Sequence, residues 1–79
     1  LTLGRDAGCG VVLDHPWVSR QHAVIEPRAG VFVLIDRSTN GTFVRLGDEE
    51  EFRLHRDEVH LRRSGAICLG QPAAATPLD

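Results

Sequence analysis

The stretch Asp36-Arg37-Ser38-Thr39-Asn40-Gly41-Thr42 decides how the fold of this chain is interpreted. It separates the apolar runs 31–35 and 42–46, and its Asn-Gly pair is the strongest short hairpin signal in the sequence. Its hydroxyl, amide and guanidinium groups donate hydrogen bonds, but none of them is a convincing catalytic base. Donors gathered without a base favour a site that holds an anion and does no chemistry on it.

Short apolar or alternating runs continue on both sides of this stretch, at intervals of about ten residues. They are rich in β-branched and aromatic side chains and comprise residues 11–13, 23–25, 31–35, 42–46, 51–54, 58–61 and 66–69. Turn signals separate them at residues 27–30, 47–48 and 64–65. No segment shows helical periodicity together with helix caps. The pattern predicts an all-β fold, an antiparallel β-sandwich whose binding loops meet at one end.

Length and charge limit the function classes. The 79 residues allow one small domain, and nine basic against eleven acidic residues give a net charge of −2. Nucleic-acid binding normally requires a basic excess, so we expect no nucleic-acid partner. No apolar run approaches the roughly 18 residues that span a membrane, and no secretory signal is recognisable. We therefore expect a cytoplasmic domain without a membrane partner, in which Cys9 and Cys68 are thiols.

The ends of the chain differ from its middle. From Gly70 the composition shifts to Gln, Pro, Ala and Thr, so we expect a domain over residues 1–69 and a Pro/Ala-rich linker or tail over 70–79. The first strand looks short, at residues 1–3, and no clear final strand follows Gly70. A sandwich that lacks edge strands exposes unpaired backbone, which predicts self-association through these edges.

Two more polar clusters accompany the first. Gly4-Arg5 ends the first apolar run, and Ser19-Arg20-Gln21-His22 precedes the run 23–25. Because loops at one end of a sandwich converge, the three clusters together would surround an ion of phosphate size. Arginine offers a planar fork of donors that matches phosphate oxygens, and serine adds a hydroxyl donor.

Catalysis and metal binding are weaker interpretations. Ser19 and His22, with Asp14 or Asp36, make a nominal triad, but adjacent loop positions rarely give the geometry that a nucleophile and its base require. A metal site would have to draw on His15, His22, His55, His60, Cys9 and Cys68. No two of these have zinc-like spacing with a matching second pair. We therefore expect no enzyme, no metal and no cofactor.

Together, the three clusters resemble the signature of the forkhead-associated (FHA) domain. The resemblance rests on Gly4-Arg5, Ser19-Arg20-Gln21-His22 and the stretch 36–42, whose order and spacing match across residues 1–46. It implies a β-sandwich whose apical loops bind phosphothreonine peptides of partner proteins in kinase-linked signalling.

The resemblance also implies roles for five binding residues. Arg5 and Ser19 would contact the phosphate, and Arg20 would add a second cationic contact. Thr39 would line the phosphothreonine pocket, and Asn40 would bind the main chain of the peptide.

Five further residues would support the site. Gly4, His22 and Gly41 look architectural in this family, with His22 holding the Ser19 loop through a ring hydrogen bond. Asp36 and Ser38 are expected to bond the backbone of their own loop, as short polar side chains commonly do.

The sequence departs from the family pattern in two places. A second Asn-Gly turn is replaced by the residues 45–48, and the usual Leu-x-x-Gly-Asp segment is replaced by Leu54-His55-Arg56-Asp57-Glu58, which has no glycine. An alternative function therefore stays open, a degenerate FHA-like module that binds partners without phosphate. Titration with a phosphothreonine peptide and its unphosphorylated twin discriminates between the two.

Overall fold

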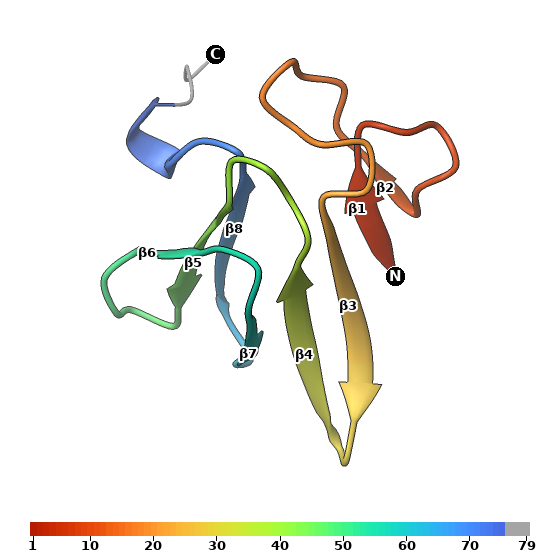
Figure 1. Cartoon of the computed structure of the whole chain (residues 1–79). Coiled ribbons are helices and arrows are strands. Elements are labelled where there is room, and N and C mark those ends of the chain that lie inside the picture. The colour runs from red at the N-terminus through yellow and green to blue at the C-terminus, as the bar shows by residue number, and fades with distance from the viewer. Residues whose placement is uncertain (76–79) are drawn as a thin grey trace.

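Two β-sheets pack face to face in the computed structural model, which describes residues 1–75 (Figure 1). The elements are β1 (Thr2–Gly4), β2 (Val11–Val12), β3 (Ala23–Arg28), β4 (Val31–Asp36), β5 (Thr42–Leu46), β6 (Phe52–Leu54), β7 (Glu58–His60), β8 (Gly65–Leu69) and a short 3-10 helix, η1 (Ala73–Ala75). One sheet has the order β2-β1-β3-β4-β7, and the other has the order β6-β5-β8. The predicted all-β sandwich is confirmed.

One strand pair differs from the expected antiparallel pattern. β1 and β2 run parallel, with Leu3 opposite Val11 and Gly4 opposite Val12, whereas every other pair within the described residues is antiparallel. The loop between them is folded by Asp6, whose side-chain and main-chain oxygens accept hydrogen bonds from the N–H groups of Gly8 and Cys9. The chain then rejoins the edge of the sheet in the direction of β1.

The turn predicted over residues 27–30 is shorter in the structure. Pro27 lies inside β3, opposite Phe32, and the turn consists of Ala29 and Gly30 at φ values of 53° and 83°. Two positive φ values are what a two-residue hairpin of the favoured twist requires. Proline is tolerated because the N–H of Ile25 points towards Leu1 and away from β4, and position 27 faces the same side, so the proline removes no hydrogen bond between β3 and β4.

The Asn40-Gly41 pair does not form the predicted hairpin. β4 lies in the first sheet and β5 in the second, so the loop 37–41 carries the chain across the sandwich. Asp36 explains the crossing, because its Oδ1 accepts hydrogen bonds from the hydroxyls of Ser38 and Thr42, both at 2.7 Å. This carboxylate fastens both ends of the loop, and Gly41 supplies the positive φ of 92°.

The hydrophobic core lies between the sheets and takes residues from both. Its buried members are Leu3, Val18, Ala23, Leu34, Val44, Leu54 and Leu69.

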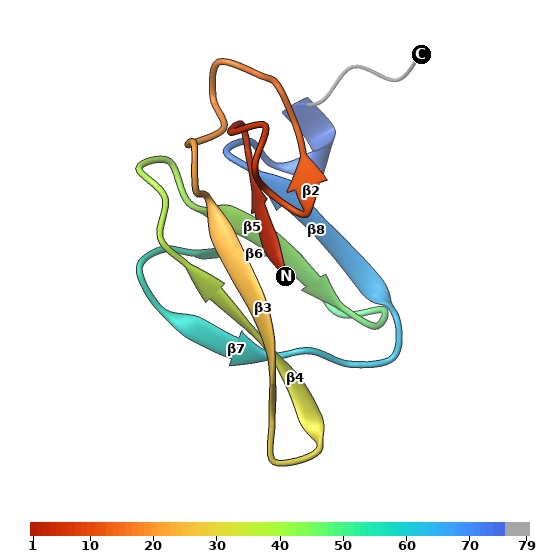
Figure 2. The same cartoon turned by 90° about the vertical axis from the view of Figure 1, so that its right-hand side faces the viewer.

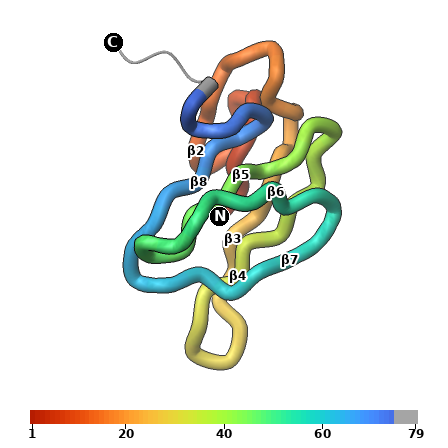
Figure 3. Tube along the Cα trace, turned by 90° about the vertical axis from the view of Figure 1, so that its left-hand side faces the viewer, coloured from red at the N-terminus to blue at the C-terminus, as the bar shows by residue number. Residues whose placement is uncertain are grey.

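The β3–β4 hairpin projects past the second sheet, as Figures 2 and 3 show, and Phe32 in this hairpin is 59% exposed. Cys9 and Cys68 are free thiols, as predicted. None of the described residues forms a helix that could cross a membrane.

Candidate functional site

Three loops meet at the upper end of the molecule in Figure 1, namely residues 5–10, 13–22 and 37–41. Main-chain hydrogen bonds join the first two, from Arg5 N to Ser19 O at 3.0 Å and from Asp6 N to Arg20 O at 3.1 Å. Gly4 makes this approach feasible, because a Cβ atom at that position would overlap the carbonyl of Arg20. The loops therefore form one continuous rim.

The rim encloses a hollow of about 250 Å³. It is lined by Arg5, Pro16, Trp17, Val18, Ser19, Thr39 and Asn40. Four of the five binding residues expected from the sequence thus lie on one surface. Arg20 is not part of the lining, and its main-chain oxygen accepts hydrogen bonds from Asp6 N and the Cys9 thiol.

Hydrogen bonds set the positions of the lining side chains. Arg5 donates from Nε to the carbonyl of Val18 at 3.0 Å, which fixes the plane of its guanidinium. Ser19 Oγ accepts the N–H of Thr39 at 3.2 Å, which ties the second loop to the third. Asn40 donates from Nδ2 to the carbonyl of Trp17 at 3.0 Å. Arginine retains further N–H donors for a ligand, and an amide retains its oxygen as an acceptor.

His22 links the second and third loops from beneath and is fully buried. Its Nδ1 accepts the N–H of Ser19 at 3.0 Å, so its proton sits on Nε2, which donates to the carbonyl of Gly41 at 2.8 Å. Burial lowers the pKa of His22 below its ordinary value of 6.5, and this outweighs the opposing effects of the Gly41 carbonyl and the Asp36 carboxylate. The imidazole is therefore neutral at physiological pH.

Asp36 is the buried anion that organises the third loop. Besides the hydroxyls of Ser38 and Thr42, it accepts the N–H groups of Ser38 and Arg56 on Oδ2. Burial alone would raise the pKa of Asp36, but the hydrogen bonds, led by that from Arg56, hold the pKa below its ordinary value of 3.8. Ser38 Oγ also accepts the N–H of Gly41 at 2.7 Å. The carboxylate stays ionised and keeps the loop in one conformation.

Several residues near the site were not expected from the sequence. Gly70 donates its N–H to the Gly41 carbonyl at 3.0 Å, and a Cβ at this position would overlap the carbonyl of Trp17. Arg53 and Arg56 donate from Nε to the carbonyls of Asn40 and Ser38, at 3.1 and 2.9 Å. These contacts are made to main-chain oxygens, which leave no pattern in a sequence.

Trp17 forms one wall of the hollow. Its ring stacks on His15 with a centroid distance of 4.8 Å and an angle of 3° between the planes. Trp17 is also one of the partly buried residues that pack against the hydrophobic core. It presents apolar surface to the same space that Arg5 and Ser19 face, so the hollow has both polar and apolar walls.

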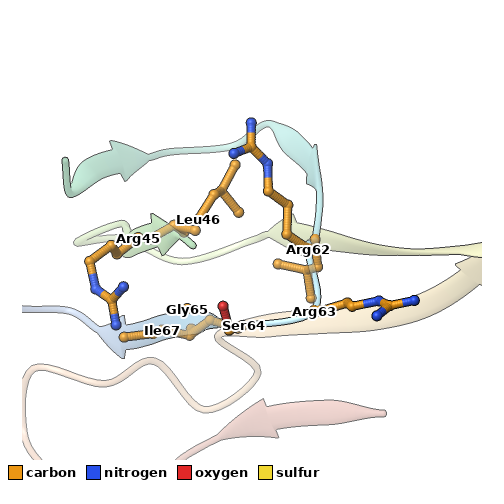
Figure 4. A pocket seen from close by; sticks show the side chains of 10 residues that line it. Arg45, Leu46, Arg62, Arg63, Ser64, Gly65 and Ile67 are labelled. Atoms are coloured by element: carbon orange, nitrogen blue, oxygen red, sulfur yellow. The ribbon is translucent and has the colours of Figure 1, made fainter. Parts of the chain in front are cut away.

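A second hollow of about 300 Å³ lies at the other end of β5. Its rim carries Arg45, Arg62 and Arg63, which resembles an anion site at first sight. Figure 4 shows that the three guanidinium groups point in different directions. Arg45 bonds the carbonyl of Gly47, and Arg62 pairs with Glu49 at 3.1 Å. These side chains do not converge on one ion. The hollow lined by Arg5, Ser19 and Asn40 is therefore the better candidate for an anion site.

Comparison with solved structures gives three similar chains, two of which are FHA domains. Rv1747 FHA-1 of Mycobacterium tuberculosis has 28% identity and a TM-score of 0.74, over 92% of this chain and 68% of that one. EmbR of Mycobacterium tuberculosis, solved in complex with a low affinity phosphopeptide, has 35% identity and a TM-score of 0.70, over 86% and 17%. The FhaA FHA domain, complexed with the intracellular domain of Rv3910, has 31% identity and a TM-score of 0.68, over 87% and 69%.

The family comparison covers the same part of the chain as the sandwich and its rim. Curated protein sequences gave no match. The family model for the FHA domain matches residues 1–69, which include all eight strands and the three loops that line the hollow. The chain therefore belongs to the FHA domain family.

Proposed function

We propose that this domain is a non-catalytic interaction module that binds phosphothreonine in partner proteins. The observation that carries the proposal is the common hollow of Arg5, Ser19, Thr39 and Asn40. A phosphate monoester has a charge of about −1.5 to −2 at neutral pH and three strong acceptor oxygens. Charge-assisted hydrogen bonds to it contribute about 1.5–3 kcal/mol each, so an arginine and a hydroxyl suffice to favour the phosphorylated ligand.

The apolar wall of the hollow supports a preference for threonine over serine. Trp17 and Val18 line the same space as the phosphate-binding groups. Burying the γ-methyl group against them would stabilise the complex by on the order of 1 kcal/mol, which is a discrimination of about fivefold. We expect the Asn40 amide to bind the main chain of the peptide, since one amide offers a donor and an acceptor together.

The hydrogen bonds of Ser19 and His22 support binding rather than catalysis as the function of this site. His22 Nδ1 accepts from the main-chain N–H of Ser19, and its Nε2 donates to Gly41. Neither ring nitrogen is available to take the proton of the Ser19 hydroxyl. A serine nucleophile requires such a base within hydrogen-bond reach, so these contacts favour binding over hydrolysis.

The similar proteins support the partner class. EmbR was solved with a phosphopeptide and FhaA with an intracellular domain of another protein. By analogy, this domain would read a kinase product in the cytoplasm of a bacterial cell. We expect an affinity of about micromolar, because the ordering and desolvation of a peptide offset much of the gross hydrogen-bond energy.

The test is a calorimetric titration with three peptides of one sequence that carry phosphothreonine, phosphoserine or threonine. We expect binding in that order, with threonine undetectable. Arg5→Ala should abolish binding of the phosphorylated peptides while the thermal melt still shows a folded domain. Equal weak binding of all three peptides would instead favour the alternative, a degenerate module that binds partners without phosphate.

A further inference from the structure

The strand β8 (Gly65–Leu69) lies at the edge of the second sheet, and one of its two sides is unpaired. It pairs with β5, and no other strand among residues 1–75 pairs with its second side. An unpaired edge presents a row of N–H and C=O groups to which another strand can bond. With five residues, β8 is longer than the other edge strands β2, β6 and β7, which have two or three. It is therefore the edge that offers the longest row of such groups.

The sequence of β8 also lacks the residues that normally protect an edge. Proteins commonly place a charged residue or a proline in an exposed edge strand, because these residues disfavour pairing with another chain. β6 carries Arg53, and β7 carries Glu58. β8 consists of Gly, Ala, Ile, Cys and Leu, none of which is charged. Its composition thus permits a pairing that the charges of β6 and β7 oppose.

Apolar surface of the first sheet adjoins this edge. Phe32 lies on the same side of β4 as the buried Leu34, since alternate residues share a face, but it is exposed because the hairpin projects past the second sheet (Figure 2). It lines a hollow of about 890 Å³ together with Leu1 and Leu61. This hollow shares residues 61–63 with the hollow that β8 lines. A strand added to β8 would therefore lie next to uncovered apolar surface, which commonly marks an interface.

The hydrogen bonds to β5 determine which main-chain groups of β8 are free. Gly70 N donates to Gly41 O at 3.0 Å, just beyond the ladder between the two strands, and this bond sets the alternation along the ladder. Every second residue before Gly70 directs its N–H and C=O groups towards β5. The residues in between direct these groups to the open side of β8, and they are Gly65, Ile67 and Leu69. This row is symmetric about Ile67, so a second β8 strand running the other way presents the same row in matching positions.

We propose that a second copy of this chain binds at β8, with the two β8 strands antiparallel about a two-fold axis at Ile67. Ile67 then lies opposite Ile67 of the second copy, and Gly65 lies opposite Leu69 of the second copy. Two residues in such pairs exchange both of their hydrogen bonds, so every outward group of β8 finds a partner. An interface of this kind is self-complementary and closes at a dimer. The edge strand β2 of the first sheet stays free, so association through β2 at high concentration would join dimers.

A disulfide between the copies tests the register. In the proposed dimer Ala66, which is exposed, lies opposite Cys68 of the second copy, in a pair whose Cα atoms stand about 4.5 Å apart. Disulfides join Cα atoms about 4.4–6.8 Å apart, so Ala66→Cys should oxidise to a covalent dimer through the native Cys68. Ala66→Cys with Cys68→Ser is the matched control, because the two introduced thiols would stand diagonally, with Cα atoms about 7–8 Å apart. Both variants also carry Cys9→Ser, which removes the remaining thiol.

Analytical ultracentrifugation gives the oligomeric state of the unmodified chain, which we expect to be a dimer that dissociates on dilution. Ile67→Pro removes the central outward N–H and keeps the bonds to β5, so it should weaken dimerisation by about tenfold or more. Val12→Lys, on β2, is the control and should leave the dimer intact. A chain that sediments as a monomer would refute the proposal, as would a dimer that Val12→Lys dissociates or a control that cross-links as readily as Ala66→Cys. If Ile67→Pro fails to fold in thermal melts, the cross-linking pair still decides. No phosphopeptide is used, so the result is independent of the proposed function.

Discussion

Gly4→Ala provides a sharp test of how the rim is built. The new Cβ would lie 2.9 Å from the Arg20 carbonyl carbon and 3.0 Å from His22 N, and closer still to the Arg20 oxygen. All three are main-chain atoms, so no side chain can move aside and the second loop must shift. Overpacking of this kind costs about 1–3 kcal/mol. The shift also strains the bonds from Arg5 N to Ser19 O and from Asp6 N to Arg20 O, at about 1 kcal/mol each.

The expected loss is thus about 3–5 kcal/mol, a large part of the stability of so small a domain. It corresponds to a fall in melting temperature of about 12 °C or more, because 1 kcal/mol shifts Tm by about 4–8 °C at this size. Gly8→Ala is the matched control in the first loop, since its Cβ would meet only Asp6 Oδ1 at 3.6 Å. Urea and thermal unfolding measure both variants. If Gly4→Ala proved as stable as Gly8→Ala, the close approach of the two loops would be wrong.

Three further predictions concern pH, the third loop and the sheet edge. The lowered pKa of His22 means that the unfolded chain gains a proton first as pH falls, so the free energy of unfolding of the wild type should decline below pH 6.5. His22→Gln should lack this part of the decline, as measured by urea titrations across pH. Asp36→Asn should lower stability by about 2–3 kcal/mol at neutral pH and abolish the additional loss that the wild type shows below pH 3.8, as measured by denaturation across pH. We propose that the exposed edge strand β2 drives self-association at high concentration, and Val12→Lys should reduce it in light scattering if that edge is responsible.

Much of the fold follows from local signals, and two of the three departures from the expected pattern share a cause. Alternating apolar runs and glycine-rich turns predicted the strands, because side-chain period and turn chemistry are local properties. The turn at Pro27 and the hairpin at Asn40-Gly41 were predicted wrongly, because the rules for turn residues do not say which strand pairs with which. Pro27 is tolerated inside β3 because its position faces away from β4, so no hydrogen bond between these two strands is lost. The loop that contains Asn40-Gly41 leads into the other sheet, because the Asp36 carboxylate accepts a hydrogen bond from the hydroxyl of Thr42 at the start of β5.

The candidate site was predictable to the extent that its groups are side chains in short motifs. Arg5, Ser19, Thr39 and Asn40 stand in recognisable clusters, and they line one hollow. Gly70, in contrast, reaches the site through a main-chain hydrogen bond from a segment with unremarkable composition. The missing glycine in residues 54–58 was visible in the sequence. Only the structure shows that Arg56 adopts a positive φ, of 54°, in that segment.

The rim is ordered by folding, and this bears on how a weak ligand can bind selectively. The Gly41 carbonyl accepts both the His22 ring N–H and the Gly70 N–H, so one acceptor joins the third loop to two other segments. His22 and the Asp36 carboxylate, both buried, hold the second and third loops before any ligand arrives. Loops that are already ordered lose little conformational entropy on binding. A few charge-assisted hydrogen bonds are then enough for micromolar affinity, and removal of the phosphate is enough to abolish it.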